Sequence, residues 1–131
     1  MIGLDTNVVV RYVMLDDPAQ SRAAGRLIDS LTPEAPGFLS LIVLAELAWV
    51  LDVSYHFDKE DLVRVLEALL QSKELIVEGA EVVTQALGLY AGGKADFADY
   101  LVERSAYTVG CAHTVTFDRR AAASAGMRLL K

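Results

Sequence analysis

The amino-acid sequence predicts an α/β fold, a three-layer sandwich in which a central, mainly parallel sheet is flanked by helices. Short runs that are almost wholly apolar alternate with longer segments of helical periodicity along the whole chain. Strands of this kind are typical of parallel sheets that are covered on both faces. With 131 residues, 53% of them hydrophobic, the chain can bury one core but is short for two ordinary domains. We therefore expect one domain over residues 1–131.

The first half of the chain predicts a repeated order of strand, polar turn and helix. The side chains of Asp5, Thr6 and Asn7 are good helix caps, and Pro18 suits the first turn of a second helix. Pro33 and the pair Pro36-Gly37 end that helix. Apolar patterning predicts strands over residues 2–4 and 38–41, both buried, and helices over residues 8–14, 18–31 and 42–51.

The second half continues the alternation. Asp58 or Ser54 is the expected cap of the next helix, and Gly92-Gly93 ends the one after it. Patterning predicts helices over residues 62–70, 80–91, 96–106 and 119–125, and strands over residues 75–77, 114–117 and 127–130. The sequence contains no repeat or linker, which agrees with a single domain.

Composition indicates where in the cell the protein is expected and how it could bind nucleic acid. No apolar run reaches the roughly 18 residues of a membrane span, and no basic segment with an apolar stretch follows Met1, so we expect a soluble cytoplasmic protein. The single cysteine, Cys111, lies among apolar residues and is expected to be a buried small hydrophobe. A net charge of −6 argues against nucleic-acid binding through a broad basic surface.

Acidic side chains with apolar neighbours are the main chemical signal. Asp5 and Asp118 each directly follow an apolar strand, and ligands of parallel sheets bind beyond the carboxyl ends of strands. Carboxylates embedded in core-forming segments need hydrogen bonds, cations or a metal ion. The acids in such settings are Asp5, Glu46, Asp96, Asp99 and Asp118. Together they predict a metal site.

The donor set indicates which metal this site would take. Asp96 and Asp99 are three residues apart, so on a helix their carboxylates share one face. Oxygen-only ligands suit Mg²⁺ or Mn²⁺, and the isolated His56 and His113 do not form a zinc site. An ion held by carboxylates that takes further oxygen ligands from phosphate fits the hydrolysis of a phosphodiester.

Three other interpretations stay open on the residues alone. Asp5, Asp96 and their neighbours are also ordinary helix caps, and Glu46 is equally a solvated helix residue. A phosphatase would use Asp5 as a covalent nucleophile, but the second acid expected two residues later is Asn7, which cannot supply a proton. A binding module would hold a structural ion or a basic peptide in the acid cluster without cleaving anything.

Four segments in order resemble a known family. They are Leu4-Asp5-Thr6-Asn7-Val8-Val9-Val10-Arg11-Tyr12, Ser40-Leu41-Ile42-Val43-Leu44-Ala45-Glu46-Leu47, Ala95-Asp96-Phe97-Ala98-Asp99-Tyr100-Leu101, and Gly110-Cys111 followed by Thr116-Phe117-Asp118-Arg119. Each segment alone is weakly specific, but the ordered set over essentially the whole chain is specific. The set resembles PIN-domain nucleases, and most closely the VapC-type toxins of toxin–antitoxin pairs.

The resemblance implies roles for individual residues. It implies that Asp5, Glu46 and Asp99 bind the metal, that Asp118 completes the quartet and that Asp96 is an auxiliary acid. Asn7 and Thr116 match polar positions that support the site through hydrogen bonds, and Thr6 is a further candidate for this role. The resemblance also implies cleavage of structured RNA such as transfer or ribosomal RNA, homodimerisation, and inhibition by a small antitoxin.

Basic and aromatic residues near the acids are candidates for holding RNA. Closeness in sequence to the acids points to Arg11, Lys94, Arg119 and Arg120 as phosphate contacts, although a solvated charge or a helix-end partner is the commoner role for any one of them. Trp49 and Tyr55 are possible stacking residues. For Trp49, packing in the core or at a dimer face is the stronger expectation.

Overall fold

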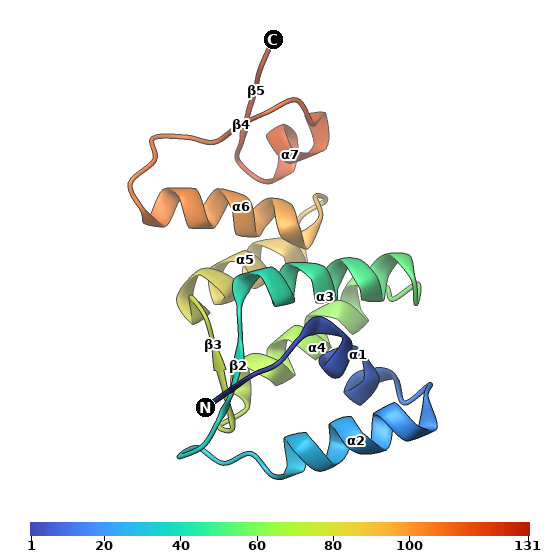
Figure 1. The fold of residues 1–131 in the computed structure, drawn as a ribbon. Coiled ribbons are helices and arrows are strands. Elements are labelled where there is room, and N and C mark those ends of the chain that lie inside the picture. Colours follow the sequence, from blue (N-terminus) through green and yellow to red (C-terminus); the bar gives the residue numbers. More distant parts are fainter. The chain divides into compact units, whose positions relative to one another are not determined.

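Single strands alternate with one or two helices along residues 1–131 of the computed structural model (Figure 1). The chain divides into two compact units, Met1–Ala80 and Glu81–Lys131. Every strand pair in either unit is parallel, and helices flank the strands. This arrangement confirms the predicted α/β class.

The first unit contains a three-stranded parallel sheet in the order β1-β2-β3. Its strands are β1 (Ile2–Gly3), β2 (Gly37–Leu39) and β3 (Leu75–Val77). Gly37 pairs with Ile2 on one side and with Leu75 on the other. A Cβ atom at Gly37 would lie 2.9 to 3.1 Å from side-chain atoms of Leu31, Leu4 and Leu75, so the packing around the central strand requires glycine there.

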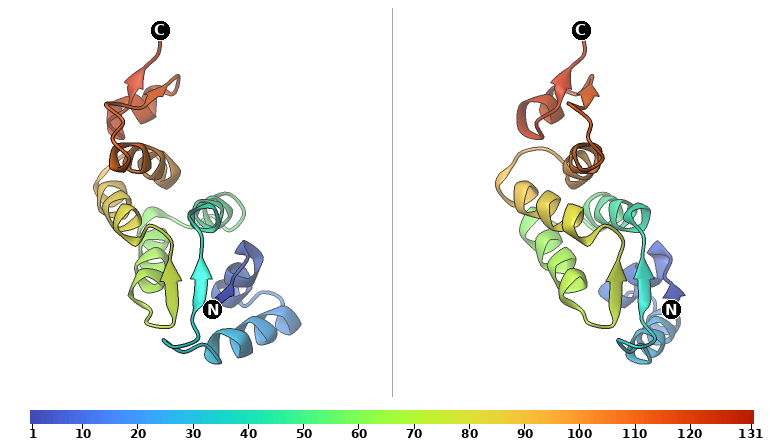
Figure 2. Two further views of the ribbon diagram at one scale, coloured as in Figure 1. Left: turned by 60° about the vertical axis from the view of Figure 1, so that its left-hand side comes forward. Right: turned by 90° about the vertical axis from the view of Figure 1, so that its left-hand side faces the viewer.

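Each helix of the first unit begins at a side-chain cap. The helices are α1 (Thr6–Met14), α2 (Pro18–Asp29), α3 (Leu41–Val53) and α4 (Lys59–Gln71), capped by Asp5, Asp17, Ser40 and Asp58 respectively. Helix α1 packs on α2 and α3, and α4 packs on β3 and α3. In the left view of Figure 2, α4 lies beside β3, and α1 and α2 lie on the side of β2 away from β3. Strand β1 ends at Gly3 and α1 begins at Thr6, so the Asp5 cap lies close to the carboxyl end of β1.

The second unit holds the remaining elements. They are α5 (Ala80–Gly92), α6 (Phe97–Thr108), β4 (Val115–Thr116), α7 (Arg119–Ser124) and β5 (Arg128–Leu129). Strands β4 and β5 form a two-stranded parallel sheet, with Val115 paired to Arg128. The rings of Phe97 and Tyr100 both meet the Tyr90 ring edge-on, which joins α5 to α6. None of the helices in the chain is both long and apolar enough to cross a lipid bilayer.

Three local expectations are wrong in detail. The strand predicted to be buried at residues 2–4 is β1, an edge strand whose Ile2 is exposed, because a sheet edge leaves side chains open. The strand predicted over residues 38–41 ends at Leu39, because the Ser40 hydroxyl accepts the Val43 N–H and starts α3 at Leu41. Cys111 is exposed, because it lies in the loop after α6.

Candidate functional site

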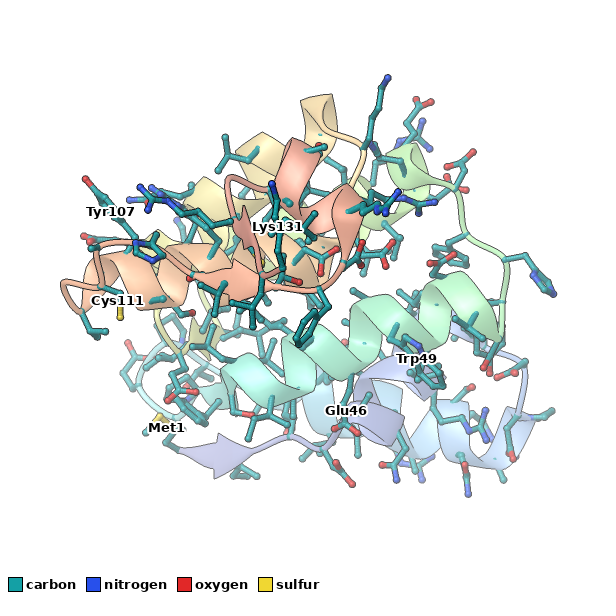
Figure 3. The ribbon with its side chains drawn as sticks, turned by 90° about the horizontal axis from the view of Figure 1, so that it is seen from above. Met1, Glu46, Trp49, Tyr107, Cys111 and Lys131 are labelled. Atoms are coloured by element: carbon teal, nitrogen blue, oxygen red, sulfur yellow. The ribbon has the colours of Figure 1, made fainter.

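Asp5 and Glu46 are linked through the residue that lies between them, Thr6. Asp5 follows β1 and caps α1, and its carboxylate accepts the Thr6 N–H at 2.8 Å. Thr6 is buried, and its hydroxyl donates to Oε1 of Glu46 at 2.9 Å. In Figure 3, Glu46 projects from α3 on the side next to α1. The start of α1 therefore holds one carboxylate through its backbone and another through a side chain.

An open groove of about 400 Å³ contains both acids. Its lining residues are Asp5, Thr6, Asn7, Val10, Arg11, Glu46, Val50, Ser54 and Tyr55. A neighbouring cavity of about 510 Å³ lies between α1 and α2 and shares Asn7 and Arg11 with the groove. Two carboxylates and one guanidinium leave the groove with an excess of negative charge, which favours cations.

Arg11 belongs to a polar cluster beside the acids. Its guanidinium donates to Gln20 at 2.7 Å, to Asp16 at 3.1 Å and to the Tyr55 hydroxyl at 3.4 Å. Tyr55 in turn donates to Asp16 at 2.8 Å. This hydrogen bond raises the pKa of Tyr55 and, with help from Arg11, lowers the pKa of Asp16. The cluster is therefore a charged network rather than a set of free side chains.

The acids of the second unit lie at the starts of its last two helices. Asp96 caps α6, and the Asp99 carboxylate accepts the Asp96 N–H at 3.0 Å. Asp118 caps α7 and accepts the N–H groups of Arg120 and Ala121 at 2.8 and 3.3 Å. The Thr116 hydroxyl accepts the Asp118 N–H at 3.0 Å, which fixes the turn between β4 and α7.

Asp99 is an acid of the second unit whose pKa departs from its ordinary value. Partial burial raises its pKa, and the negative charges of Asp96 and Asp118 act in the same direction. The hydrogen bond from the Asp96 backbone and the charge of Arg120 oppose this shift without cancelling it. Asp99 therefore lies within electrostatic range of two other carboxylates and is partly desolvated.

A buried hydrogen-bond network joins α6 to α7. The Tyr100 side chain is 1% exposed, and its hydroxyl lies 2.8 Å from the Ser124 hydroxyl and accepts the Ala95 N–H at 3.3 Å. The Lys94 N–H donates to Ser124 at 2.7 Å. A Cβ atom at Gly93 would overlap the Tyr100 hydroxyl, so glycine is needed there. This network ties the segment before Asp96 to the helix that Asp118 caps.

The predicted site residues fall in both units. The first unit contains Asp5, Thr6, Asn7, Arg11 and Glu46, and the second contains Lys94, Asp96, Asp99, Thr116, Asp118, Arg119 and Arg120. Neither unit gathers three or more His, Cys, Asp or Glu side chains in a group that could hold a metal ion. Asp5, Glu46, Asp96 and Asp118 are exposed, contrary to the expectation of embedded acids, because helix caps are open to solvent and the groove that Glu46 lines is also open.

Several polar residues of these networks were not predicted from the sequence. Asp16 and Gln20 contact Arg11, and Ser124 and Tyr100 join α6 to α7. Asp16 is five residues after Arg11, beyond the end of α1, so no helical spacing indicates their contact. The sequence predicts Tyr55 only as a possible stacking residue, but in the structure its hydroxyl donates a hydrogen bond to Asp16.

Comparison with known proteins decides the family. The family model of the PIN domain matches residues 2–126, which is almost the whole chain. The chain belongs to the PIN domain family. It is also similar to a VapC ribonuclease of Aquifex aeolicus (strain VF5), with 31% identity over 78 residues. That match covers 60% of this chain and 58% of the relative, so the chain spans little more than half of the relative's length. Both findings confirm the predicted resemblance.

Proposed function

We propose that this PIN-domain protein is a metal-dependent endoribonuclease that hydrolyses RNA phosphodiester bonds as the toxin of a VapBC-type toxin–antitoxin system. The observation that carries the proposal is the Asp5-Thr6-Glu46 arrangement, in which two exposed carboxylates are fixed in one groove of a PIN domain. The similarity to a VapC ribonuclease supports RNA as the substrate. The single domain over residues 1–131 and a cytoplasmic location are parts of the same proposal.

The donor chemistry fits a hard divalent cation. Carboxylate oxygens are the only strong ligands lining the groove of the first unit, and neither histidine nor cysteine lines it. Mg²⁺ or Mn²⁺ is the cation that suits such oxygens. The residues proposed as metal ligands are Asp5 and Glu46 in the first unit and Asp99 and Asp118 in the second, with Asp96 as an auxiliary acid. When bound, the cation would lower the pKa of a water molecule and offset charge that develops on the phosphate.

The chain's own groups orient these acids. The Thr6 N–H and hydroxyl each occupy one carboxylate oxygen, on Asp5 and Glu46 respectively, and the other oxygen of each carboxylate makes no hydrogen bond. Thr116 fixes the turn that carries Asp118, and Asn7 lines the groove beside Asp5. Supporting hydrogen bonds of this kind keep carboxylate ligands in one orientation. We therefore assign Thr6, Asn7 and Thr116 supporting roles.

The partners follow from the proposed activity. We propose transfer or ribosomal RNA as the substrate, a cognate antitoxin protein as the inhibitor, and a homodimer as the assembly. Arg11, Lys94, Arg119 and Arg120 are the proposed RNA contacts; of these, Lys94, Arg119 and Arg120 are exposed. The exposure of Trp49 at 63% supports a role at a surface and excludes the predicted alternative of a core position.

Expression without an antitoxin tests the proposal. The protein and its Asp5→Asn variant would each be induced in a bacterial host, and the 5′ ends of total RNA would be mapped. New 5′ ends at defined sites, found with the wild type and not with the variant, are expected. An unchanged map of 5′ ends would overturn the proposed activity, and equal maps for both proteins would overturn the role of Asp5.

A further inference from the structure

Arg11 occupies the position where two cavities of the first unit meet. It lines both the acidic groove and the cavity between α1 and α2, and it is the only Lys or Arg residue that lines either of them. Its side chain is 31% exposed. Arg11 is therefore the first positively charged side chain that an anion would contact if it approached the acids of the groove from this side.

Three neighbours fix the guanidinium and leave part of it free. Nε donates to Gln20, and Nη1 donates to Asp16 and to Tyr55. A guanidinium carries five N–H donors, and the two on Nη2 make no hydrogen bond. The side chain is therefore held in one orientation while two donors stay available to a ligand.

The groups that hold Arg11 are themselves fixed. Asp16 lies in the loop between α1 and α2, Gln20 lies on α2, and Tyr55 follows the end of α3. The buried Ser21 hydroxyl donates to the backbone carbonyl of Arg11 at 2.9 Å, which ties α2 to the end of α1. An exposed Arg–Asp pair adds little to stability by itself. The main consequence of this network is therefore the orientation of Arg11.

We propose that Arg11 binds a backbone phosphate of the RNA substrate beside the acidic groove, and that Asp16, Gln20 and Tyr55 are positioning residues for it. The proposal rests on the proposed ribonuclease function, because RNA as the ligand follows from that function. The planar fork of arginine matches phosphate oxygens, and its prior orientation reduces the entropy lost on binding. An acidic segment of a protein partner is the competing ligand.

RNA binding can be measured separately from cleavage. Variants in an Asp5→Asn background would be titrated with fluorescein-labelled single-stranded RNA of random sequence at several salt concentrations. Arg11→Ala is expected to weaken binding roughly tenfold and to reduce the salt slope by about 0.7, as the loss of one phosphate contact does. Arg22→Ala is the matched control, because Arg22 is an exposed arginine of α2 without a hydrogen-bond partner. It is expected to bind like the parent protein.

The positioning residues allow a sharper test. Asp16→Ala removes a negative charge, so electrostatics alone predicts tighter RNA binding. The proposal predicts weaker binding by about threefold, because Arg11 loses its orientation. Tyr55→Phe leaves the charge unchanged and is expected to weaken binding in the same direction. In cleavage assays of the same substitutions without the Asp5→Asn change, KM should rise while kcat stays within about twofold.

Each result supports or overturns the proposal. Equal Kd values of Arg11→Ala and Arg22→Ala for RNA would overturn it, and so would tighter RNA binding by Asp16→Ala. It would also be overturned if Arg11→Ala lost binding to an acidic peptide but bound RNA as before. If Arg11→Ala does not fold, Arg11→Lys and Tyr55→Phe provide the same comparison. If the wild type binds RNA without cleaving it, the ribonuclease function fails, and the Kd series still decides the role of Arg11. Absence of any RNA binding overturns both.

Discussion

The hydroxyl of Thr6 donates a hydrogen bond of 2.9 Å to Oε1 of Glu46, forty positions further along the chain. The backbone N–H of the same threonine binds the carboxylate of Asp5. One buried residue at the start of α1 thus fixes two acids that come from different elements. This relationship supports a shared role for Asp5 and Glu46 and suggests how to test that role.

Replacing Thr6 by Val should lower kcat/KM for RNA cleavage by about tenfold, because Glu46 loses the group that orients it. The backbone hydrogen bond to Asp5 remains, so the free energy of unfolding should fall by only about 1 kcal/mol. Thr6→Ser keeps the hydroxyl and should restore most of the activity. Equal activity of Thr6→Val and the wild type would show that the hydrogen bond does not matter for the reaction.

Glu46→Gln should lower cleavage roughly a hundredfold or more, since the amide removes the negative charge that the reaction requires. The amide oxygen can still accept the Thr6 hydroxyl, so urea unfolding should be unchanged. Glu67→Gln on the exposed side of α4 is a matched control and should keep full activity. The role of Glu46 is wrong if the two variants cleave RNA at the same rate.

Gly93→Ala should destabilise the protein by about 1 to 3 kcal/mol, because the added methyl group overlaps the Tyr100 hydroxyl and the buried ring has no room to move. Tyr100→Phe removes the hydroxyl and should relieve part of that cost in the double variant. Urea unfolding of the two single variants and the double variant measures the coupling. Additive changes in the free energy of unfolding would contradict the contact.

The stability difference between wild type and Asp99→Asn should depend on pH. The pKa of Asp99 is raised in the folded protein above its ordinary value of 3.8, mainly by burial. Because the folded protein binds this proton more tightly than the unfolded chain does, protonation of Asp99 stabilises the fold. This stabilisation is complete below the ordinary pKa and is lost as the pH rises through the raised pKa. In the presence of a chelator, Asp99→Asn should gain stability relative to the wild type as the pH rises from 3.8 through the raised pKa. A difference that stays constant or falls over this range would contradict the assignment.

Much of the fold could be predicted because local signals agree with it. Asp5 and Asp58 mark helix starts by residue type, and the apolar strands between helices indicate parallel pairing. Strand ends were less predictable. Leu41 is apolar enough for a strand, but the Ser40 cap places it in α3.

The residue types of the candidate site could be predicted from the sequence, but the contacts of those residues could be predicted less well. The sequence indicates that Asp5 and Glu46 belong to one site, but it does not show that Thr6 joins them, because that contact depends on how α1 packs on α3. The link of Arg11 to Asp16 and Tyr55 likewise depends on the loop after α1 and on the end of α3. Contacts between distant segments carry no signal in a single sequence.

We propose that carboxylates of this PIN domain catalyse RNA hydrolysis with a divalent cation. The most direct measurement is cleavage of total RNA by the purified protein with Mg²⁺, with Mn²⁺ and with a chelator, beside Asp5→Asn under the same conditions. Asn is as good a helix cap as Asp, so this variant should keep its fold. We expect cleavage by the wild type with either metal, and none with the chelator or with Asp5→Asn. Equal cleavage in the chelator, or by the variant, would contradict it.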